Sequence, residues 1–189
     1  MSRVCVFFAE GFEEVEALTV VDLLRRAQIK TDMVSISGEL FVTGRSGITV
    51  KTDVLYDKAA PESADMLVLP GGMPGVRYLG ECGPLKELLS RFHAEGKELA
   101  AICAAPMVFG KLGIVRGKRA AIYPGMEGEL IGAEAVVSEE VVRDGNVTTS
   151  RGAGTAIPFA LSLIETLSGK EAAENVKKGI VFRQSDVLY

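Results

Sequence analysis

One cysteine, Cys103, lies where an apolar run gives way to small residues and a proline, in the segment ELAAICAAPMVFG at residues 98–110. A cysteine that acts as a nucleophile usually needs a neighbouring base to activate it. The chain has a single histidine, His93, ten residues before Cys103. A buried cysteine with no catalytic role fits the same pattern, because free cysteine is among the most buried residue types. What surrounds Cys103 must therefore decide its chemistry.

The histidine lies too far from Cys103 to serve as the base. His93 falls in a predicted helix at 84–95, and the following predicted strand at 98–102 ends directly before Cys103. Five strand residues at about 3.3 Å each separate the two side chains by about 15 Å or more. We interpret His93 as a solvent-facing histidine on a helix surface.

Carboxylates after the first predicted strand are the alternative proton carriers. The segment AEGFEEVE contains four of them: Glu10, Glu13, Glu14 and Glu16. Acidic residues are favoured in the first turn of any helix, so most of these need no functional explanation. Glu16 differs because helical spacing aligns it with Val20 and Leu23, which predicts that it is partly buried. It is the strongest candidate for the proton shuttle.

The residues around Cys103 suit a sharp turn from strand to helix. Alanines precede and follow the cysteine, and Pro106 fits a first helical turn because its missing N–H would have no partner there. Free N–H groups at the start of that helix are expected to lower the pKa of the thiol and to favour thiolate.

A glycine pair follows a buried strand in the segment LVLPGGMPG at 67–75. Gly71 and Gly72 allow a backbone N–H to come close to a substrate oxygen, as an oxyanion hole requires. A plain turn at the end of a strand explains the same residues. The later segment RGAGT at 151–155 lacks the third glycine of a dinucleotide-binding loop and the lysine of a phosphate-binding loop, so we interpret it as a helix start.

Short apolar runs alternate with helix-length amphipathic segments along the chain. This alternation predicts an α/β fold, a mostly parallel sheet with helices on both faces, in one domain over residues 1–189. We expect strands at 3–8, 31–36, 65–69 and 98–102, helices at 13–27, 84–95, 155–167 and about 170–178, and hairpins at 39–52 and 141–150; 119–122 and 134–138 are further candidate strands. Because the carboxyl ends of parallel strands share one edge, Cys103, Gly72 and Glu16 are expected to converge there.

Composition excludes several function classes. The net charge is −4 with scattered Lys and Arg, which argues against nucleic acid as a partner. The first apolar run, residues 4–8, is too short for a signal peptide or a membrane span, so we expect a cytoplasmic protein that does not bind membranes. Three cysteines without a C-x-x-C pair and one histidine predict neither disulfides nor a metal site, and we expect no cofactor.

Four motifs together resemble the ThiJ/PfpI superfamily, specifically its DJ-one branch, the parkinsonism-associated deglycase branch. They are E-E-x-E after the first strand, L-P-G-G after the third, A-I-C-A at the cysteine and T-S-R-G-x-G-T near residue 150. The likeness covers nearly the whole chain. It implies a flavodoxin-like three-layer sandwich and a homodimer, with Arg45 and the nearby Arg26 at the dimer interface.

The resemblance also assigns roles in the site. Cys103 would be the nucleophile and a redox-sensitive thiol, Glu16 its protonated partner, and the N–H groups of Gly72 and Ala104 an oxyanion hole, with Gly71 beside them. Where vertebrate-type members carry a histidine in a T-H-P segment, this chain reads AIYPG, so Tyr123 lines the pocket instead. Protease-like relatives have a histidine directly after the nucleophile, and here that residue is Ala104.

Three functions remain open on this evidence. The first is a cofactor-free enzyme of the glyoxalase III or deglycase type, which acts on reactive 2-oxoaldehydes or on the proteins they have glycated. The second is a redox sensor or holdase chaperone of the oxidative stress response, controlled by oxidation of Cys103. The third, a cysteine peptidase or amidase, needs a histidine that only another subunit could supply.

Overall fold

A seven-stranded, mostly parallel sheet forms the centre of the computed structural model, which describes residues 2–183. The strand order is β10-β11-β7-β6-β1-β2-β5, and every neighbouring pair is parallel except β10 and β11. The strands are β1 (Arg3–Phe8), β2 (Lys30–Ser35), β5 (Val54–Leu55), β6 (Met66–Leu69), β7 (Glu98–Ile102), β10 (Val141–Asp144) and β11 (Val147–Ser150). Continuous apolar runs build β1, β6 and β7 because both faces of each strand are covered.

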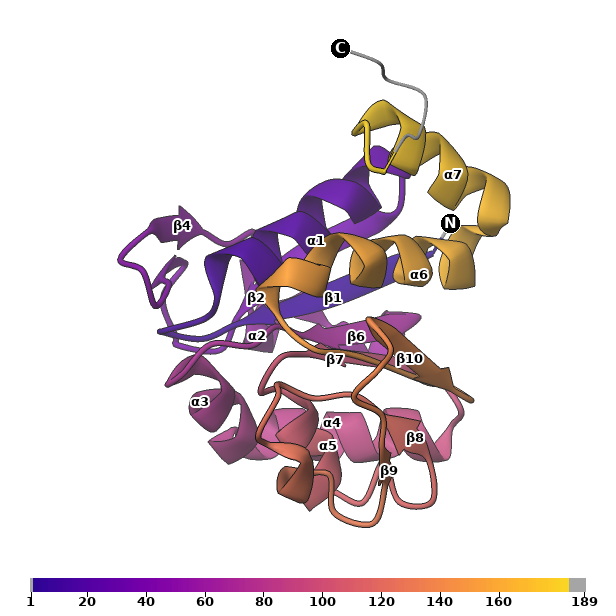
Figure 1. The fold of residues 1–189 in the computed structure, drawn as a ribbon. Helices are drawn as coiled ribbons and strands as arrows, with labels where there is room; N and C mark the ends of the chain where they lie inside the picture. Colours follow the sequence, from indigo (N-terminus) through magenta and orange to yellow (C-terminus); the bar gives the residue numbers. More distant parts are fainter. Residues whose placement is uncertain (1, 184–189) are drawn as a thin grey trace.

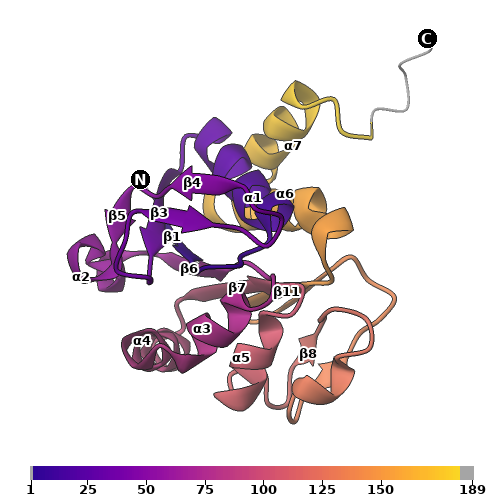
Figure 2. The same ribbon diagram turned by 90° about the vertical axis from the view of Figure 1, so that its left-hand side faces the viewer.

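Helices cover both faces of the sheet, which gives the expected flavodoxin-like three-layer arrangement (Figures 1 and 2). One layer contains α1 (Glu14–Arg26) and α6 (Ala156–Ser168), with α7 (Lys170–Gly179) packed on α6. The opposite layer contains α3 (Gly75–Glu81), α4 (Gly83–Ala94) and α5 (Pro106–Lys111). Among residues 2–183, no helix combines the length and apolarity needed to span a bilayer.

Smaller elements lie outside the main sheet. The predicted hairpin is present as the antiparallel pair β3 (Phe41–Thr43) and β4 (Thr49–Lys51). The candidate strands at 119–122 and 134–138 are shorter than expected, and form the parallel pair β8 (Arg119–Ala120) and β9 (Glu134–Ala135). The remaining pieces are α2 (Tyr56–Ala59) and three 3₁₀ turns: η1 (Pro61–Ser63), η2 (Glu127–Glu129) and η3 (Ala153–Thr155).

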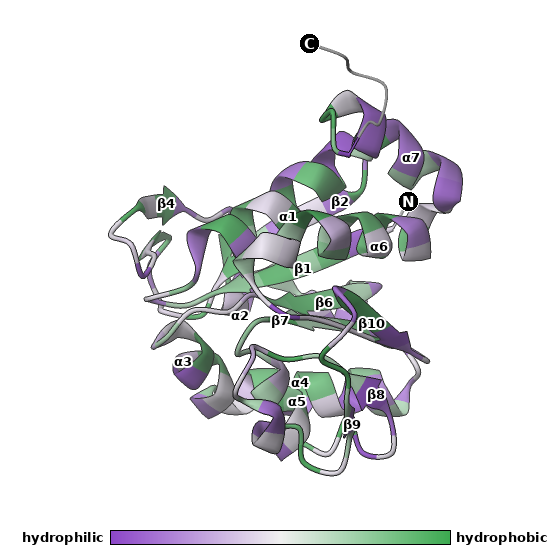
Figure 3. Cartoon of the chain, viewed as in Figure 1, coloured by the Kyte–Doolittle hydropathy of each residue, from purple (hydrophilic) through white to green (hydrophobic). Residues whose placement is uncertain are grey.

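Apolar residues concentrate in the central strands, whereas the outer surface of α7 is polar (Figure 3). Phe7 and Phe8 of β1 are fully buried, as is Cys5 in the same strand. Burying an aromatic side chain of this size stabilises a fold by roughly 1.5–3 kcal/mol. The rigid centre fixes the strand ends from which the site side chains arise.

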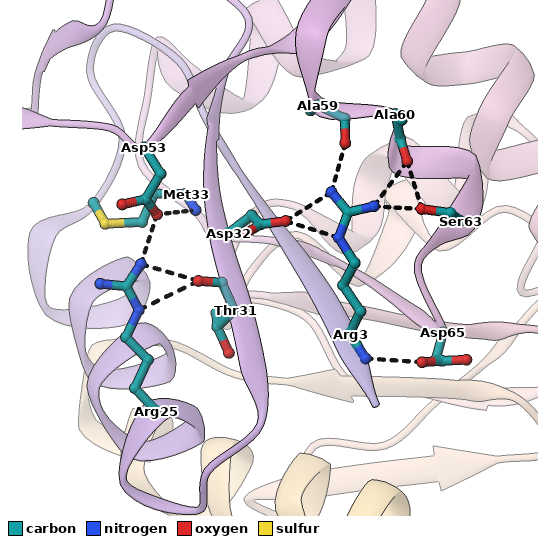
Figure 4. A network of polar contacts seen from close by, with 10 residues as sticks. All are labelled: Arg3, Arg25, Thr31, Asp32, Met33, Asp53, Ala59, Ala60, Ser63 and Asp65. Atoms are coloured by element: carbon teal, nitrogen blue, oxygen red, sulfur yellow. Dashed lines mark hydrogen bonds and ion pairs between the residues drawn. The ribbon is translucent and has the colours of Figure 1, made fainter. Parts of the chain in front are cut away.

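Two arginines tie the amino-terminal half of the sheet together (Figure 4). Arg3 at the start of β1 pairs with Asp32 of β2 at 2.7 Å and donates to the carbonyl oxygens of Ala59 and Ala60, which fastens α2 and η1 to the sheet. Arg25 of α1 pairs with Asp53 at 2.6 Å and donates to the carbonyl oxygen of Thr31, so α1 is fastened to β2. Both networks are structural.

Candidate active site

The predicted site residues lie at the carboxyl edge of the sheet, after the ends of three neighbouring strands. β6 pairs with both β1 and β7, so the carboxyl ends of these strands are neighbours. Glu16 lies in the first turns of α1 after β1, Gly71 and Gly72 follow β6, and Cys103 follows β7. The structure brings these residues together, as the parallel topology predicted.

The backbone of Cys103 adopts an unusual conformation at this edge. Its φ angle is 63°, in the left-handed region that costs a non-glycine residue on the order of 1 kcal/mol. The neighbouring chain holds the turn: Cys103 N–H donates to Ser150 O at 3.0 Å, and Tyr123 N–H donates to Cys103 O at 2.8 Å. The turn presents the sulfur at the rim while leaving the residue only 8% exposed.

Glu16 is buried against the thiol. Its side chain is 1% exposed and is hydrogen-bonded to Cys103, and Gly71 N–H donates to Glu16 Oε2 at 2.9 Å. The start of α1 is fixed because Glu16 N–H donates to the Glu13 carboxylate at 2.7 Å. Burial raises the pKa of Glu16 to about 7, against the opposing effects of Cys103, Gly71 and the Arg45 charge. A carboxyl group with this pKa can both give and take a proton at neutral pH.

The two glycines after β6 are required by close packing. A methyl group on Gly71 would overlap Glu16 Oε2 and lie 3.0 Å from Cys103 Sγ. Gly72 has a φ of 92°, and a methyl group there would come within 2.6 Å of Gly11 O. Because Gly71 and Gly72 have no side chain, the backbone and the Glu16 carboxyl group can pack closely around the Cys103 sulfur.

The expectation that the turn into the following helix favours the thiolate of Cys103 is wrong, although the N–H group of Ala104 does lower the pKa of the thiol. Burial and the Glu16 carboxylate raise the pKa of Cys103 to about 12, and hydrogen bonds from the N–H groups of Ala104 and Gly72 only partly offset them. α5 is a single short helix of six residues, which limits its electrostatic contribution. Cys103 and Glu16 therefore titrate as a coupled pair.

Tyr123 lies beside the pair, where the sequence placed it. A methyl group on Gly152 would lie 3.6 Å from the Tyr123 ring and 4.0 Å from Glu16 Oε1, so both side chains border Gly152. The interpretation of RGAGT as a helix start does not identify Gly152 as a site residue. Gly152 belongs to the T-S-R-G-x-G-T motif, which could have indicated it. The segment matches neither a dinucleotide-binding loop nor a phosphate-binding loop, so its glycines give no direct sign of a site.

The remaining residues considered in the sequence analysis lie farther from the Cys103 thiol. Arg45 is exposed on the turn between β3 and β4, and Arg26 pairs with Asp22 at 2.7 Å on the surface of α1. His93 lies near the carboxyl end of α4, which precedes β7, and is therefore at the far end of that strand from Cys103. Its exclusion as a base for Cys103 is consistent with this placement, but the expected solvent-facing position is wrong, because His93 is half-buried and its Nδ1 has no hydrogen-bond partner among the described residues.

Comparison with known proteins identifies the family. The sequence profile of the DJ-1/PfpI family matches residues 2–166. The chain belongs to the DJ-1/PfpI family. It is similar to protein dj-1beta of Drosophila melanogaster, with 39% identity, 93% of this chain covered and 95% of the relative. A relative named as a deglycase, from Pyrococcus abyssi, is 32% identical to this chain, and the match covers 87% of this chain and 99% of the relative.

Solved DJ-1 structures share the fold. The oxidised form of Toxoplasma gondii DJ-1 superposes with a TM-score of 0.93 at 32% identity, covering 97% of this chain and all of that one. The Drosophila DJ-1beta crystal structure gives 0.92 at 39% identity, over 96% and 98% of the two chains. The DJ-1/PfpI assignment therefore stands on sequence and structure together.

Proposed function

We propose that the protein is a cofactor-independent enzyme that converts reactive 2-oxoaldehydes to hydroxy acids, a glyoxalase III or deglycase-like activity. The carrying observation is the buried Glu16 carboxyl group, with a pKa near neutrality, hydrogen-bonded to the Cys103 thiol. A nucleophile and a proton shuttle are the two groups that this isomerisation needs. The name of the Pyrococcus deglycase supports the class of reaction.

The first step is addition of Cys103 to the aldehyde. As the sulfur attacks the aldehyde carbon of methylglyoxal, ionised Glu16 accepts the proton of the Cys103 thiol. The C–S bond forms, the C=O π bond breaks, and Glu16 protonates the resulting alkoxide to give a hemithioacetal. The N–H groups of Gly72 and Ala104, which hydrogen-bond the Cys103 sulfur, would form the oxyanion hole that stabilises the negative charge on the former aldehyde oxygen.

The second step moves hydrogen between the two carbons. Ionised Glu16 takes the proton from the former aldehyde carbon, which gives an enediolate, and returns it to the neighbouring carbon, which gives a thioester of Cys103. Water then cleaves the C–S bond and releases lactate and the thiol. The overall change is methylglyoxal plus water to lactate, so no oxidant, metal or glutathione is consumed. The same chemistry would apply to hemithioacetals and aminocarbinols that methylglyoxal has formed on proteins.

The direct test is lactate formation from methylglyoxal without glutathione. We expect turnover by the wild-type chain and none by Cys103→Ser, because an alcohol is a far weaker nucleophile at this site. Wild-type protein that is folded and gives no lactate contradicts the proposed activity.

A redox sensor or holdase chaperone is the second candidate. The supporting observation is that Cys103 keeps an exposed fraction of 8% beside a carboxyl group that can donate a hydrogen bond to an oxidised sulfur, and a Toxoplasma relative was solved in oxidised form. Mass spectrometry after mild peroxide should show two added oxygens on Cys103 and none on Cys5. Earlier oxidation of Cys82 would remove the support for this role. A peptidase or amidase is least favoured because His93 is remote.

We also propose a homodimer, which would work in the cytoplasm on small carbonyl compounds or glycated proteins. The turn between β3 and β4 packs against the start of α1: Arg45 N–H donates to Phe12 O, and Ser46 N–H donates to the Glu14 carboxylate. Large apolar side chains around this contact are more than half exposed: Val15, Phe41 and Ile48. Such a cluster favours burial against a second copy. Arg45 would lie in this interface, with Arg26 toward its edge.

A further inference from the structure

A groove of about 320 Å³ lies between α3 and α5, outside the group of residues that surrounds Cys103. Its floor is apolar and comes from Val76 and Gly80 of α3 and from Met107 and Val108 of α5. Charged side chains form the rim. None of the chemical steps derived above uses this groove.

The chain path places one end of the groove beside the thiol. Gly72, whose N–H is directed at the sulfur, is followed immediately by Met73, which lines the groove. Ala104, the other N–H donor, is followed after two residues by Met107, which lines the opposite wall. α3 and α5 are neighbours in the same layer (Figure 2). The groove therefore lies beside the two segments that carry the N–H donors, and Met107 N–H donates to Ala104 O at 3.1 Å.

The lining suits an apolar group. Methionine side chains are flexible and polarisable, so the two that border the groove can adapt to rings and to alkyl chains. Met73 is half exposed, and a bound apolar group would cover it. At the rim, Arg77 is already paired with Glu81 at 2.8 Å, so these charges offer little to a small polar ligand.

We propose that this groove is the subsite for the carbon substituent of the carbonyl substrate, and that it selects 2-oxoaldehydes with an aryl or long alkyl group over methylglyoxal. The inference rests on the proposed function for its substrate class. With the aldehyde carbon at Cys103 Sγ and its oxygen at the two N–H groups, a substituent on the adjacent carbon can extend between Met73 and Met107. The methyl group of methylglyoxal is too small to fill this space.

Gly80 offers a way to close the groove without touching the reacting groups. A methyl group on Gly80 would lie 3.5 Å from Val108 Cγ2, which is ordinary van der Waals contact. Gly80→Ala should therefore fold and leave most of the groove open, and the helix gains from alanine. Gly80→Phe should place its ring in the groove, and a thermal melt verifies that it is folded.

The turnover test compares phenylglyoxal with methylglyoxal. We expect the wild-type kcat/KM to be at least tenfold higher for phenylglyoxal. Gly80→Phe should lower kcat/KM for phenylglyoxal about tenfold and leave kcat/KM for methylglyoxal within twofold of the wild type. Gly80→Ala should leave kcat/KM for both substrates close to the wild-type values. If folded Gly80→Phe loses kcat/KM equally for both substrates, or loses none for phenylglyoxal, the proposed subsite is wrong.

A binding test separates failure of the subsite from failure of the activity. Cys103→Ser protein with ¹³C-methyl methionine is titrated with phenylglyoxylate, which cannot be turned over, and with pyruvate as the matched small ligand. We expect phenylglyoxylate to shift the Met73 and Met107 methyl signals and to leave buried Met66 unchanged, and Gly80→Phe to abolish the shifts. If neither signal moves, the subsite is wrong even where methylglyoxal is turned over. If both move in a protein without turnover, the subsite holds and the proposed reaction fails.

Discussion

Cys103 and Glu16 are buried in contact with each other, so the protonation of one sets the chemistry of the other. If the sulfur is to attack an aldehyde, the shared proton must lie on Glu16, and if Glu16 is to take a proton from carbon, it must be ionised. A pKa of about 7 for Glu16 keeps both forms accessible at neutral pH. In the proposed reaction, the pair takes the role that a histidine has in other cysteine enzymes.

The raised pKa of Glu16 predicts how stability depends on pH. Because the folded-state value, about 7, exceeds the ordinary 4.5, the folded chain binds the proton more tightly than the unfolded chain. This stabilisation is fully present below pH 4.5 and is lost as the pH rises through 7, with a total on the order of 3 kcal/mol. Glu16→Gln should remove the dependence. Denaturant unfolding at pH 5 and pH 8 measures this pH dependence of the free energy of unfolding. The same dependence in Glu16→Gln as in the wild type contradicts the raised pKa of Glu16.

A single methyl group at Gly71 should damage the site. Gly71→Ala places its Cβ over Glu16 Oε2 and beside Cys103 Sγ, so the pair must separate. We expect turnover to fall more than a hundredfold, together with a loss of about 1–3 kcal/mol of stability from overpacking. Gly83→Ala is the control, because nothing lies within 4 Å of its added methyl. Near-normal activity in Gly71→Ala would show that the close contact is not needed.

At the scale of the elements, the site is the meeting point of the ends of β1, β6 and β7. The sequence was sufficient to predict these strands, because each is a continuous apolar run, and the parallel topology then brought Glu16, Gly72 and Cys103 together. α3 was not predicted, because it starts in a Pro- and Gly-rich segment and contains Gly75 and Gly80, which weaken the helical pattern. A local motif does not predict the raised pKa of the thiol, because the burial of Cys103 and its contact with Glu16 depend on segments that are distant in the sequence.

The position of β7 predicts that the histidine has no part in catalysis. His93 lies on α4 before the strand, whereas Cys103 lies after it. We expect His93→Ala to keep kcat and KM for methylglyoxal within twofold of the wild type. Tyr123→Phe should also be mild, since the ring that borders Gly152 is retained and only its hydroxyl is lost. Loss of turnover in folded His93→Ala would require a histidine-dependent mechanism.

At the scale of the whole molecule, the exposed apolar cluster at the start of α1 predicts a second copy. Ile48→Asp should shift the mass measured by light scattering from dimer to monomer, because a charge would be buried in the interface. Val137→Asp is the matched control, since Val137 is equally exposed but lies beyond β9, away from the cluster. A wild-type monomer at micromolar concentration, or a dimer that survives Ile48→Asp, contradicts this assembly.

Lactate formation by Glu16→Gln, beside the wild type, tests the central claim most directly. Glutamine retains the size of Glu16 and can still donate a hydrogen bond to sulfur, but it cannot carry a proton. If Glu16 moves the proton between the two carbons, the variant should give no lactate from methylglyoxal while its Cys103 is still oxidised by peroxide. Lactate formation at the wild-type rate in Glu16→Gln would show that the carboxyl group is not the proton shuttle.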